Sequence, residues 1–261
     1  MADIDIPSLL PVPPSGLLQG ASLFLDFDGT LVPLVDEPEA VTVDPELRAL
    51  LHRLKNVLDG RLAIVSGRSI KALRELFGLE DFFLAGSHGL ELARPGEAPR
   101  APARLAAVDY AEAALNAFAA DKPGLLIERK TLSVGLHFRR APLLADACRN
   151  LAERLAQETG LFLQTGKMLY ELRPGGADKG TAIRQLMLEA PLSPGVPLFL
   201  GDDVTDENGF AASLELGGSG ILVGPARPTL ARWRLEHVGA VRHYLSESIA
   251  HLPGEDVLAP S

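Results

Sequence analysis

Residues 22–31 of the chain read Ser-Leu-Phe-Leu-Asp-Phe-Asp-Gly-Thr-Leu and give the clearest indication of the fold class. The apolar run over residues 22–27 is typical of a strand buried on both faces of a parallel sheet. It ends in two carboxylates, Asp26 and Asp28, which are unfavourable beside an apolar strand unless a cation or several hydrogen bonds compensate them. Open α/β sheets bind ligands at the carboxyl ends of their parallel strands. We therefore expect Asp26 and Asp28 to belong to a functional site, and not to a plain turn.

The chain on both sides of this stretch alternates short apolar runs with helical periodicity. Asp44 is a favourable N-cap, and Pro45 is suited to the first position of the helix that follows. The expected elements are a helix over 44–60, a strand over 62–65, a helix over 70–78, a helix over 179–190, and strands over 196–200 and 220–223. Such alternation predicts an α/β fold with a Rossmann-like core, in which helices cover both faces of a parallel sheet.

Residues 106–173 follow a different pattern, that of a small α+β domain inserted into the core. The expected elements are a helix over 106–120, the strand pair 125–130 with 132–139, and the strand pair 161–166 with 168–172. In the second strand, apolar residues alternate with Ser133, His137 and Arg139, which predicts a sheet with one apolar and one charged face. An ordinary solvated sheet face is one reading of this pattern, and a surface that binds sugar hydroxyls is the other.

These patterns predict a division of the chain into a leader and two domains. We expect a flexible leader over 1–20, a discontinuous core domain over 21–105 and 174–261, and the inserted domain over 106–173.

The composition excludes several classes of protein. The 261 residues include 25 basic and 34 acidic side chains, a net charge of −9, which argues against general nucleic-acid or anionic-membrane binding. The single cysteine, Cys148, excludes a disulfide framework or a multi-cysteine metal site. No apolar run approaches the roughly 18–20 residues that span a bilayer, and the N-terminus lacks the pattern of a signal peptide. We expect a cytoplasmic protein, and a monomer.

Polar residues also follow the other predicted strands and open a later helix. Ser66, with Gly67 and Arg68, follows the second strand, and Lys179 opens a helix. Residues 201–207 carry four acids after the late strand, a set of oxygen ligands that suits Mg²⁺. Gly29 permits a tight turn whose backbone amides, including that of Thr30, can point at an anion.

In this order, the motifs resemble those of the haloacid dehalogenase-like phosphatase superfamily. The resemblance implies that Asp26 is the nucleophile and Asp28 the general acid and base. It implies further that Asp26, Asp28, Asp202, Asp203 and Asp206 form the metal site. The implied phosphate-binding residues are Gly29, Thr30, Ser66, Gly67, Arg68 and Lys179. Residues 106–173 then correspond to the family's second type of cap domain, which is an α+β insertion.

A narrower resemblance, to trehalose-6-phosphate phosphatases, rests on residues 86–91, 128–130, 133–139, 167–174 and 201–207. It implies Mg²⁺-dependent hydrolysis of trehalose 6-phosphate through an aspartyl-phosphate, the last step of trehalose biosynthesis. The implied sugar-binding residues are Glu128, Lys130, Arg139, Lys167 and Glu171, to which we add His88 because glycines flank it after an apolar strand. One departure is Asp178, where the family more often has Asn before Lys-Gly.

Other functions stay open on the sequence alone. The nearest is a phosphatase for another sugar phosphate, such as sucrose 6-phosphate or a glucosylglycerate phosphate. A phosphomutase would use the same nucleophile but would depend on a bisphosphate activator, and a binding module without activity would bind substrate but release no phosphate. Lys179 precedes its glycine and is therefore not part of a P-loop, and no G-x-S-x-G nucleophile motif is present.

Overall fold

A computed structural model describes residues 10–35 and 41–252, which divide into two compact units. The core unit contains the described residues up to Arg100 and from Asp178 onward, and the cap unit is Ala101–Ala177. Of the predicted leader over 1–20, residues 1–9 lie outside the described residues. No helix in the described ranges has the length and apolar character needed to cross a membrane.

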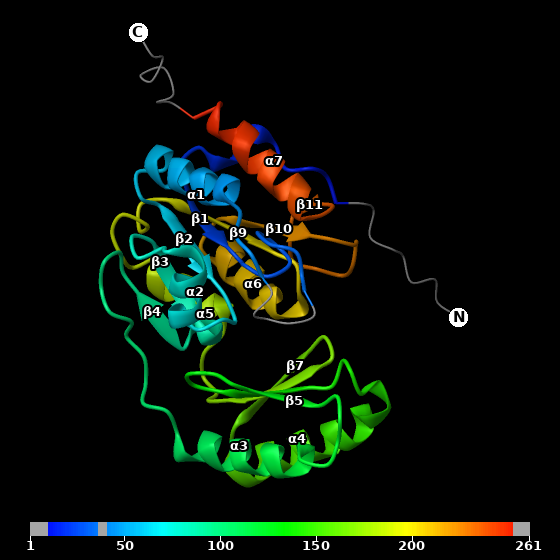
Figure 1. The fold of residues 1–261 in the computed structure, drawn as a ribbon. Coiled ribbons are helices and arrows are strands. Elements are labelled where there is room, and N and C mark those ends of the chain that lie inside the picture. The colour runs from blue at the N-terminus through cyan, green and yellow to red at the C-terminus, as the bar shows by residue number, and fades with distance from the viewer. Residues whose placement is uncertain (1–9, 36–40, 253–261) are drawn as a thin grey trace. The chain divides into compact units, whose positions relative to one another are not determined.

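The core unit is built on a seven-stranded sheet in the order β11-β10-β9-β1-β2-β3-β4 (Figure 1). All neighbouring strands are parallel except β3 and β4. The strands are β1 (Ala21–Leu25), β2 (Leu62–Val65), β3 (Phe83–Gly86), β4 (Glu91–Ala93), β9 (Val196–Gly201), β10 (Ser219–Val223) and β11 (Trp233–Leu235). The predicted parallel α/β sheet is thus confirmed, with β1 at its centre.

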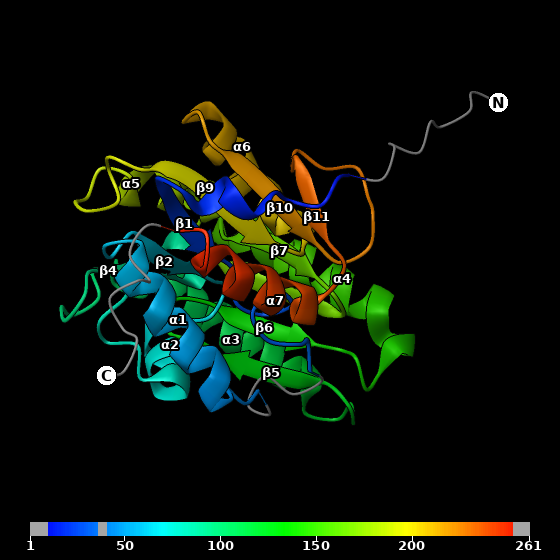
Figure 2. The same ribbon diagram turned by 90° about the horizontal axis from the view of Figure 1, so that it is seen from above.

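Helices cover both faces of this sheet. They are α1 (Pro45–Val57), α2 (Ile70–Phe77), α5 (Lys179–Leu186), α6 (Glu207–Glu215) and α7 (Val238–Ile249), with the short 3-10 helices η1 (Ser15–Leu18), η3 (Ser87–Gly89) and η5 (Val204–Asp206). Alternate residues of β1 point to opposite faces: Leu23 and Leu25 pack with α1, α2 and α7, whereas Phe24 packs with α5 and α6. Figure 2 shows α1 and α7 lying across one face.

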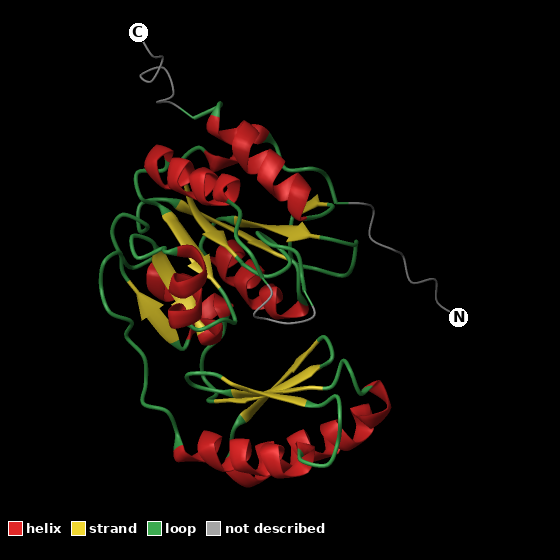
Figure 3. Ribbon diagram, in the orientation of Figure 1, coloured by secondary structure: helices red, strands yellow, loops and turns green. Residues whose placement is uncertain are grey.

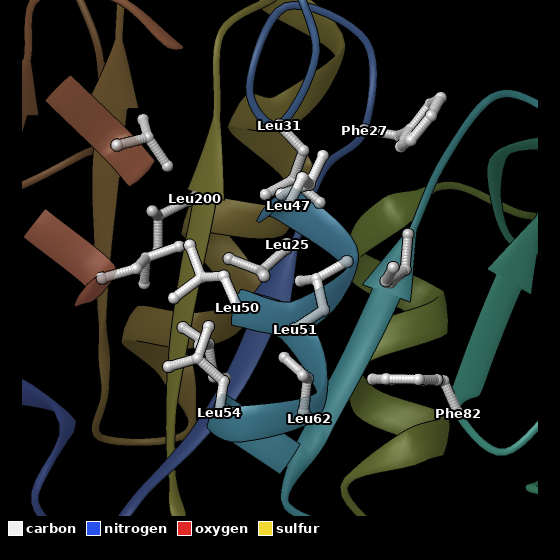
Figure 4. Packing of buried hydrophobic residues seen from close by; sticks show 14 of the residues in the cluster. Leu25, Phe27, Leu31, Leu47, Leu50, Leu51, Leu54, Leu62, Phe82 and Leu200 are labelled. Carbon is white, nitrogen blue, oxygen red and sulfur yellow. The ribbon is translucent and has the colours of Figure 1, made fainter. Parts of the chain in front are cut away.

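Leucines of α1 fill the first of these two layers (Figure 4). Leu51 and Leu54 are fully buried on α1, and the side chains of Leu25 and Leu200 come toward them from the sheet. Burial of each such side chain contributes roughly 1.5–3 kcal/mol relative to exposure. This packing positions β1 and β9, and an aspartate of the predicted site directly follows each strand.

The described part of the predicted leader, residues 10–20, is packed against the core unit. Leu18 is fully buried, and the carbonyl oxygens of Pro11 and Pro14 accept hydrogen bonds from Arg234 N (3.0 Å) and Tyr244 Oη (3.2 Å). Proline has no N–H but keeps its carbonyl acceptor, so a proline-rich segment can still be fixed by neighbouring donors.

The cap unit pairs a four-stranded antiparallel sheet, in the order β5-β6-β8-β7, with helices on one face (Figure 3). Its elements are α3 (Ala106–Ala119), β5 (Leu126–Arg129), β6 (Val134–His137), η4 (Pro142–Leu144), α4 (Ala145–Thr159), β7 (Phe162–Gly166) and β8 (Leu169–Arg173). Val134 and Leu136 point from β6 into the layer between sheet and helices, where Cys148 of α4 is also buried. The opposite face of β6 therefore carries Ser133, Gly135 and His137.

Candidate active site

Parallel pairing places the predicted motif residues at one edge of the core sheet. β1 lies between β2 and β9, and Leu25 is in register with Ile64 and Leu200. Asp26 follows β1, and its backbone N–H donates to the carbonyl of Leu200 at 2.9 Å. Ser66 follows β2 and Asp202 follows β9. The carboxyl ends of three neighbouring strands thus supply one site, as the sequence predicts.

A glycine allows the loop after β1 to approach the loop after β9. Gly29 has φ +84°, and a Cβ atom there would lie 2.1 Å from Asp202 Oδ2. Only glycine combines this left-handed conformation with this contact. The next residue, Thr30, is buried, and its hydroxyl has no hydrogen-bond partner among the described residues.

Lys179 forms ion pairs with the carboxylates of Asp26 and Asp206. Its ammonium lies 2.7 Å from Asp26 Oδ1 and 2.5 Å from Asp206 Oδ1, and all three side chains are almost fully buried. Lys179 is the first residue of α5, whose N-cap is Asp178: the Asp178 carboxylate accepts a hydrogen bond from Thr181 N at 2.7 Å. Aspartate and asparagine cap helices about equally well, so the departure at Asp178 keeps the position of Lys179.

Asp26, Asp202 and Asp206 form a compact acidic cluster. Their nearest ligand atoms all lie within 4.8 Å of one another, and Asp202 Oδ1 is a buried acceptor without a hydrogen-bond partner among the described residues. Burial raises the pKa of Asp202 to about 7, and the charge of Asp206 adds to this shift. Burial likewise raises the pKa of Asp26, because Lys179 only partly offsets desolvation and the two neighbouring carboxylates. Three carboxylates around one ammonium are a donor set that fits a further hard cation.

The loop after β9 distinguishes the remaining predicted ligands. Asp206 is fully buried, and its carboxylate accepts a hydrogen bond from Asp203 N at 2.8 Å. Gly201 makes room for Asp206, whose Cγ would lie 2.4 Å from a Cβ atom at that position. Asp203 is exposed, and its carboxylate caps Val204 N at 2.6 Å. Asp206 therefore belongs to the acidic cluster, whereas the Asp203 side chain caps the backbone of the loop after β9.

Asp28 is held by Arg68 and not by the acidic cluster. The Arg68 guanidinium donates to both carboxylate oxygens, from Nε at 2.6 Å and from Nη2 at 2.7 Å. Such a bidentate pair fixes the plane of the carboxylate. Arg68, predicted to bind phosphate, thus contacts the predicted acid and base in this structure, and Ser66 Oγ accepts from its backbone N–H at 3.1 Å.

His88 lies against the turn after β2, in an unusual backbone conformation. Ser87 and His88 have φ of 49° and 56°, and a Cβ atom at Gly67 would lie 2.7 Å from the His88 ring. The buried carboxylate of Glu91 holds this arrangement, because it accepts from Ile70 N at 2.8 Å and from Ser87 Oγ at 3.0 Å. Sequence reasoning missed Glu91 as a site residue, although the Ser-His-Gly-Leu-Glu string that contains it was recognised.

The charged face of the cap sheet carries a connected network. Lys130 Nζ lies 2.6 Å from Glu171 Oε2 and 3.9 Å from Glu128 Oε2. Ser133 Oγ donates to Glu171 Oε1 at 2.5 Å, and His137 Nε2 is 2.8 Å from Glu128 Oε2. Burial would raise the pKa of Glu128, but the His137 bond and the Lys130 charge hold it below its ordinary value.

The other two predicted sugar-binding residues of the cap unit are Arg139 and Lys167. Arg139 is half-buried after β6, and Lys167 is exposed in the turn between β7 and β8. Ser133 and His137 were not among the predicted sugar-binding residues, although their alternation with apolar residues had assigned them to this face.

The arrangement in the core unit can carry out phosphoryl transfer. A buried carboxylate at a strand end, beside an ammonium and a set of cation ligands, can attack phosphorus while positive charge gathers around the phosphoryl oxygens. The arrangement in the cap unit offers carboxylate acceptors and an ammonium donor, which suit hydroxyl groups.

Comparison with known proteins gives concordant matches. A family model described as trehalose-phosphatase matches residues 24–238. The trehalose-6-phosphate phosphatase of Escherichia coli (strain K12) is 39% identical over 229 residues, which cover 85% of this chain and 84% of that protein.

Solved structures show the same fold. One described as a trehalose-6-phosphate phosphatase related protein has a TM-score of 0.75 at 30% identity and covers 88% of this chain and 97% of its own. The C-terminal domain of the C. albicans trehalose-6-phosphate phosphatase has a TM-score of 0.80 over 94% of this chain and 99% of its own; at 24% identity it supports the fold alone.

Proposed function

Because the chain belongs to the trehalose-phosphatase family, we propose that it hydrolyses trehalose 6-phosphate to trehalose and inorganic phosphate. The observation that carries this proposal is the buried Asp26 carboxylate at the end of β1, 2.7 Å from Lys179 and within the acidic cluster. The enzyme is accordingly a phosphoric monoester hydrolase.

The first half of the reaction transfers the phosphoryl group to Asp26. A carboxylate oxygen of Asp26 forms a bond to phosphorus as the bond from phosphorus to the sugar oxygen breaks, which gives an aspartyl-phosphate. The electron pair of the broken bond stays on the sugar oxygen, and Asp28 donates a proton to it. In this structure, two hydrogen bonds from Arg68 fix the orientation of the Asp28 carboxylate.

The second half releases phosphate and restores the enzyme. Water attacks the phosphorus, Asp28 takes a proton from that water, and the bond between phosphorus and Asp26 breaks. Inorganic phosphate leaves, so Asp26 and Asp28 return to their starting states and one water is consumed in each cycle.

Donors around Asp26 would stabilise the charge on the phosphoryl oxygens. The Lys179 ammonium and the Ser66 hydroxyl are the side-chain donors, and Thr30, Arg68 and the backbone N–H of Gly67 are proposed as further ligands. The backbone N–H of Gly29, which the sequence also predicts as a ligand, donates to the carbonyl of Val32 at 2.8 Å in this structure. Burial lowers the pKa of Lys179, but the carboxylates of Asp206 and Asp26 more than offset this and keep it cationic.

The acidic cluster fits Mg²⁺, which Asp26, Asp202 and Asp206 would hold. The orphaned Asp202 Oδ1 and the raised pKa of Asp26 and Asp202 both indicate oxygen ligands with too little positive charge nearby. When bound, the cation neutralises negative charge on the phosphoryl oxygens and on the cluster. Participation of Asp28 and Asp203 in the metal site stays a prediction.

The charged face of the cap unit would recognise the sugar. Glu128 and Glu171 can accept hydrogen bonds from hydroxyl groups, and Lys130 can donate. We assign Arg139, Lys167 and His88 to sugar binding as well, on the family resemblance. Selectivity then follows from the bonds that a smaller sugar leaves unmade.

A panel of phosphate esters tests the reaction. Phosphate release is measured with trehalose 6-phosphate, sucrose 6-phosphate, a glucosylglycerate phosphate, glucose 6-phosphate and p-nitrophenyl phosphate, each with Mg²⁺ and with chelator. We expect Mg²⁺-dependent release with a clear preference for trehalose 6-phosphate. Preference for another sugar phosphate would reassign the substrate, and dependence on a sugar bisphosphate would indicate a mutase. Substrate binding without release would contradict an enzymatic role. A cytoplasmic location and a monomeric state stay predictions from the sequence.

A further inference from the structure

An arginine near the start of the cap unit contacts the turn that joins β5 to β6. Arg104 lies two residues ahead of α3, and its side chain is only 17% exposed. Its Nη1 atom donates to three backbone carbonyls of that turn, those of Lys130 (2.6 Å), Thr131 (3.1 Å) and Ser133 (3.3 Å). One guanidinium thus binds the backbone of the whole turn over residues 130–133.

Two acids of α3 hold this guanidinium in place. Asp109 accepts from Arg104 Nε at 2.7 Å, and Glu112 accepts from Arg104 Nη2 at 2.6 Å. The two acids are three residues apart and therefore neighbours on the helix surface. The planar guanidinium has donors in several fixed directions, so two of its nitrogens bind α3 while the third binds the turn. Arg104 thereby connects the turn to the first two turns of a helix.

The turn that Arg104 contacts carries two of the groups that bind Glu171. Lys130 Nζ lies 2.6 Å from Glu171 Oε2, and Ser133 Oγ donates to Glu171 Oε1 at 2.5 Å. The Glu171 carboxylate is buried, and a buried carboxylate is unfavourable without partners. The position of the turn backbone therefore determines whether both oxygens of Glu171 keep their partners.

The backbone of the turn has little regular structure of its own. Residues 131 and 132 form a bend outside the strands, and a hydrogen bond from Lys130 N to the carbonyl of Ser133, at 3.1 Å, spans this bend. That bond does not engage the carbonyls of Lys130 and Thr131, which accept from Arg104. Connecting segments are more mobile than the elements they join, so these additional bonds restrict the turn where its own backbone pairing is weakest.

We propose that Arg104 is a positioning residue for sugar recognition, because it fixes the turn that presents Lys130 and Ser133 to Glu171. This inference rests on the proposed function, which assigns the charged face of the cap sheet to the sugar. Arg104 acts through the backbone of the turn and is assigned no contact with the sugar. Its loss should weaken sugar binding and leave phosphoryl transfer, which is assigned to the core unit, unchanged.

The test compares Arg104→Ala with a matched control, Arg129→Ala. Arg129 pairs with the same two acids, Glu112 at 2.8 Å and Asp109 at 3.8 Å, and within the described part of the chain its side chain donates to carboxylates only. KM and kcat are measured for trehalose 6-phosphate and for p-nitrophenyl phosphate, with the thermal midpoint of each variant. We expect Arg104→Ala to raise KM for the sugar phosphate about tenfold and to leave both constants for p-nitrophenyl phosphate unchanged. Arg129→Ala should match the wild type on both esters.

A second variant, Arg104→Lys, separates the contacts with the turn from the charge beside the two acids. Lysine keeps a positive charge for Asp109 and Glu112, but its single nitrogen cannot lie within hydrogen-bond distance of both acids and the turn carbonyls at once. We expect a thermal midpoint above that of Arg104→Ala and a KM for the sugar phosphate that is still raised. The same variant supplies the KM comparison if Arg104→Ala does not fold.

Three results would overturn the proposal: a wild-type KM in Arg104→Lys, an equal rise of KM for both esters in the Arg104 variants, or an equal rise in Arg129→Ala. The preference of the wild type among sugar phosphates, measured alongside, tests the proposed function separately. If the wild type prefers another sugar phosphate, the proposed substrate is wrong, and the same KM comparison with that ester still decides the role of Arg104.

Discussion

The acidic cluster brings two buried aspartates, Asp26 and Asp206, and the half-buried Asp202 together within a few ångströms. The ammonium of Lys179 is buried beside Asp26 and Asp206. Buried ionised groups are stable only when paired, and loss of one partner leaves the other uncompensated. Lys179 pairs with two of the three acids, which leaves the cluster short of positive charge. The cluster therefore lowers the stability of the metal-free protein and at the same time favours cation binding.

The shortage of positive charge in the acidic cluster predicts that the stabilisation of the protein by Mg²⁺ depends on pH. Since burial raises the pKa of Asp202 from 3.8 to about 7, the folded protein binds a proton there that the unfolded chain does not hold between these values. The contribution of Asp202 to stability is therefore greatest below about pH 4 and is lost as the pH rises to about 7. Asp26, whose pKa is also raised, acts in the same direction. We expect Mg²⁺ to raise the thermal midpoint of chelator-treated protein more at pH 8 than at pH 5.

Asp202→Asn is the matching variant for this prediction. It should flatten the dependence of the midpoint on pH in chelator and weaken the response to Mg²⁺. A Mg²⁺ shift that is as large at pH 5 as at pH 8 would contradict the assignment of the raised pKa to the cation site.

Substrates with different leaving groups should distinguish the role of Asp28 from that of Asp26. A sugar oxygen needs a proton to leave, whereas p-nitrophenolate leaves without one, so Asp28→Asn should reduce kcat/KM for trehalose 6-phosphate by about 10²–10⁴. With p-nitrophenyl phosphate, the same variant should release a rapid burst of p-nitrophenol followed by a slow steady rate, because only the water attack still needs a base. Rapid-mixing absorbance measures the burst. Asp26→Asn serves as the control and should show no burst, since it lacks the nucleophile; a burst from Asp26→Asn would remove Asp26 from that role.

At the scale of the elements, α1 depends on one aspartate that links three segments. Asp44 Oδ1 accepts from Leu47 N at 2.7 Å, as expected for an N-cap, and Asp44 Oδ2 lies 2.5 Å from Arg242 of α7. Arg242 also donates to the carbonyl of Leu31, at 3.0 and 3.1 Å, close to the loop that follows Asp26. Asp44 thus fixes the start of α1 and, through Arg242, the end of the active-site loop.

Two variants at position 44 separate the contribution of the helix cap to stability from that of the ion pair with Arg242. Asp44→Ala removes the cap and the ion pair and should lower the free energy of unfolding by about 1–2 kcal/mol. Asp44→Asn keeps the cap acceptor, so its loss should be no more than about 1 kcal/mol, the range of a half-exposed ion pair. Urea unfolding measures both values. Equal losses would mean that the ion pair, and not the cap, carries the stabilisation.

The elements also show where local patterns are reliable. The cap of α1, the buried β1 and β2, and the two-faced β6 were predictable, because capping residues and period-two alternation are properties of a few consecutive residues. The left-handed pair at Ser87 and His88 was not predictable, because the Glu91 carboxylate that supports it also binds the first residue of α2, Ile70.

For the whole molecule, we propose that phosphoryl transfer and sugar recognition belong to different units of the chain. Glu171→Ala should then raise KM for trehalose 6-phosphate far more than KM for p-nitrophenyl phosphate, because it removes the acceptor bonded to Lys130 and Ser133 and leaves the core unit intact. Steady-state kinetics with both esters measures this split. Equal increases for the two esters would remove the charged face from sugar recognition.

Local sequence patterns are enough to predict the fold class, the order of the motifs, and the gathering of Asp26, Ser66 and Asp202 at one sheet edge. This was possible because each motif directly follows a buried strand, and parallel strands place their carboxyl ends together. Only the folded structure shows which groups are in contact: Asp206 and not Asp203 joins the acidic cluster, and Arg68 holds Asp28. These pairings depend on strand register and on the position of the α5 N-terminus, which are set by packing between segments far apart in the chain.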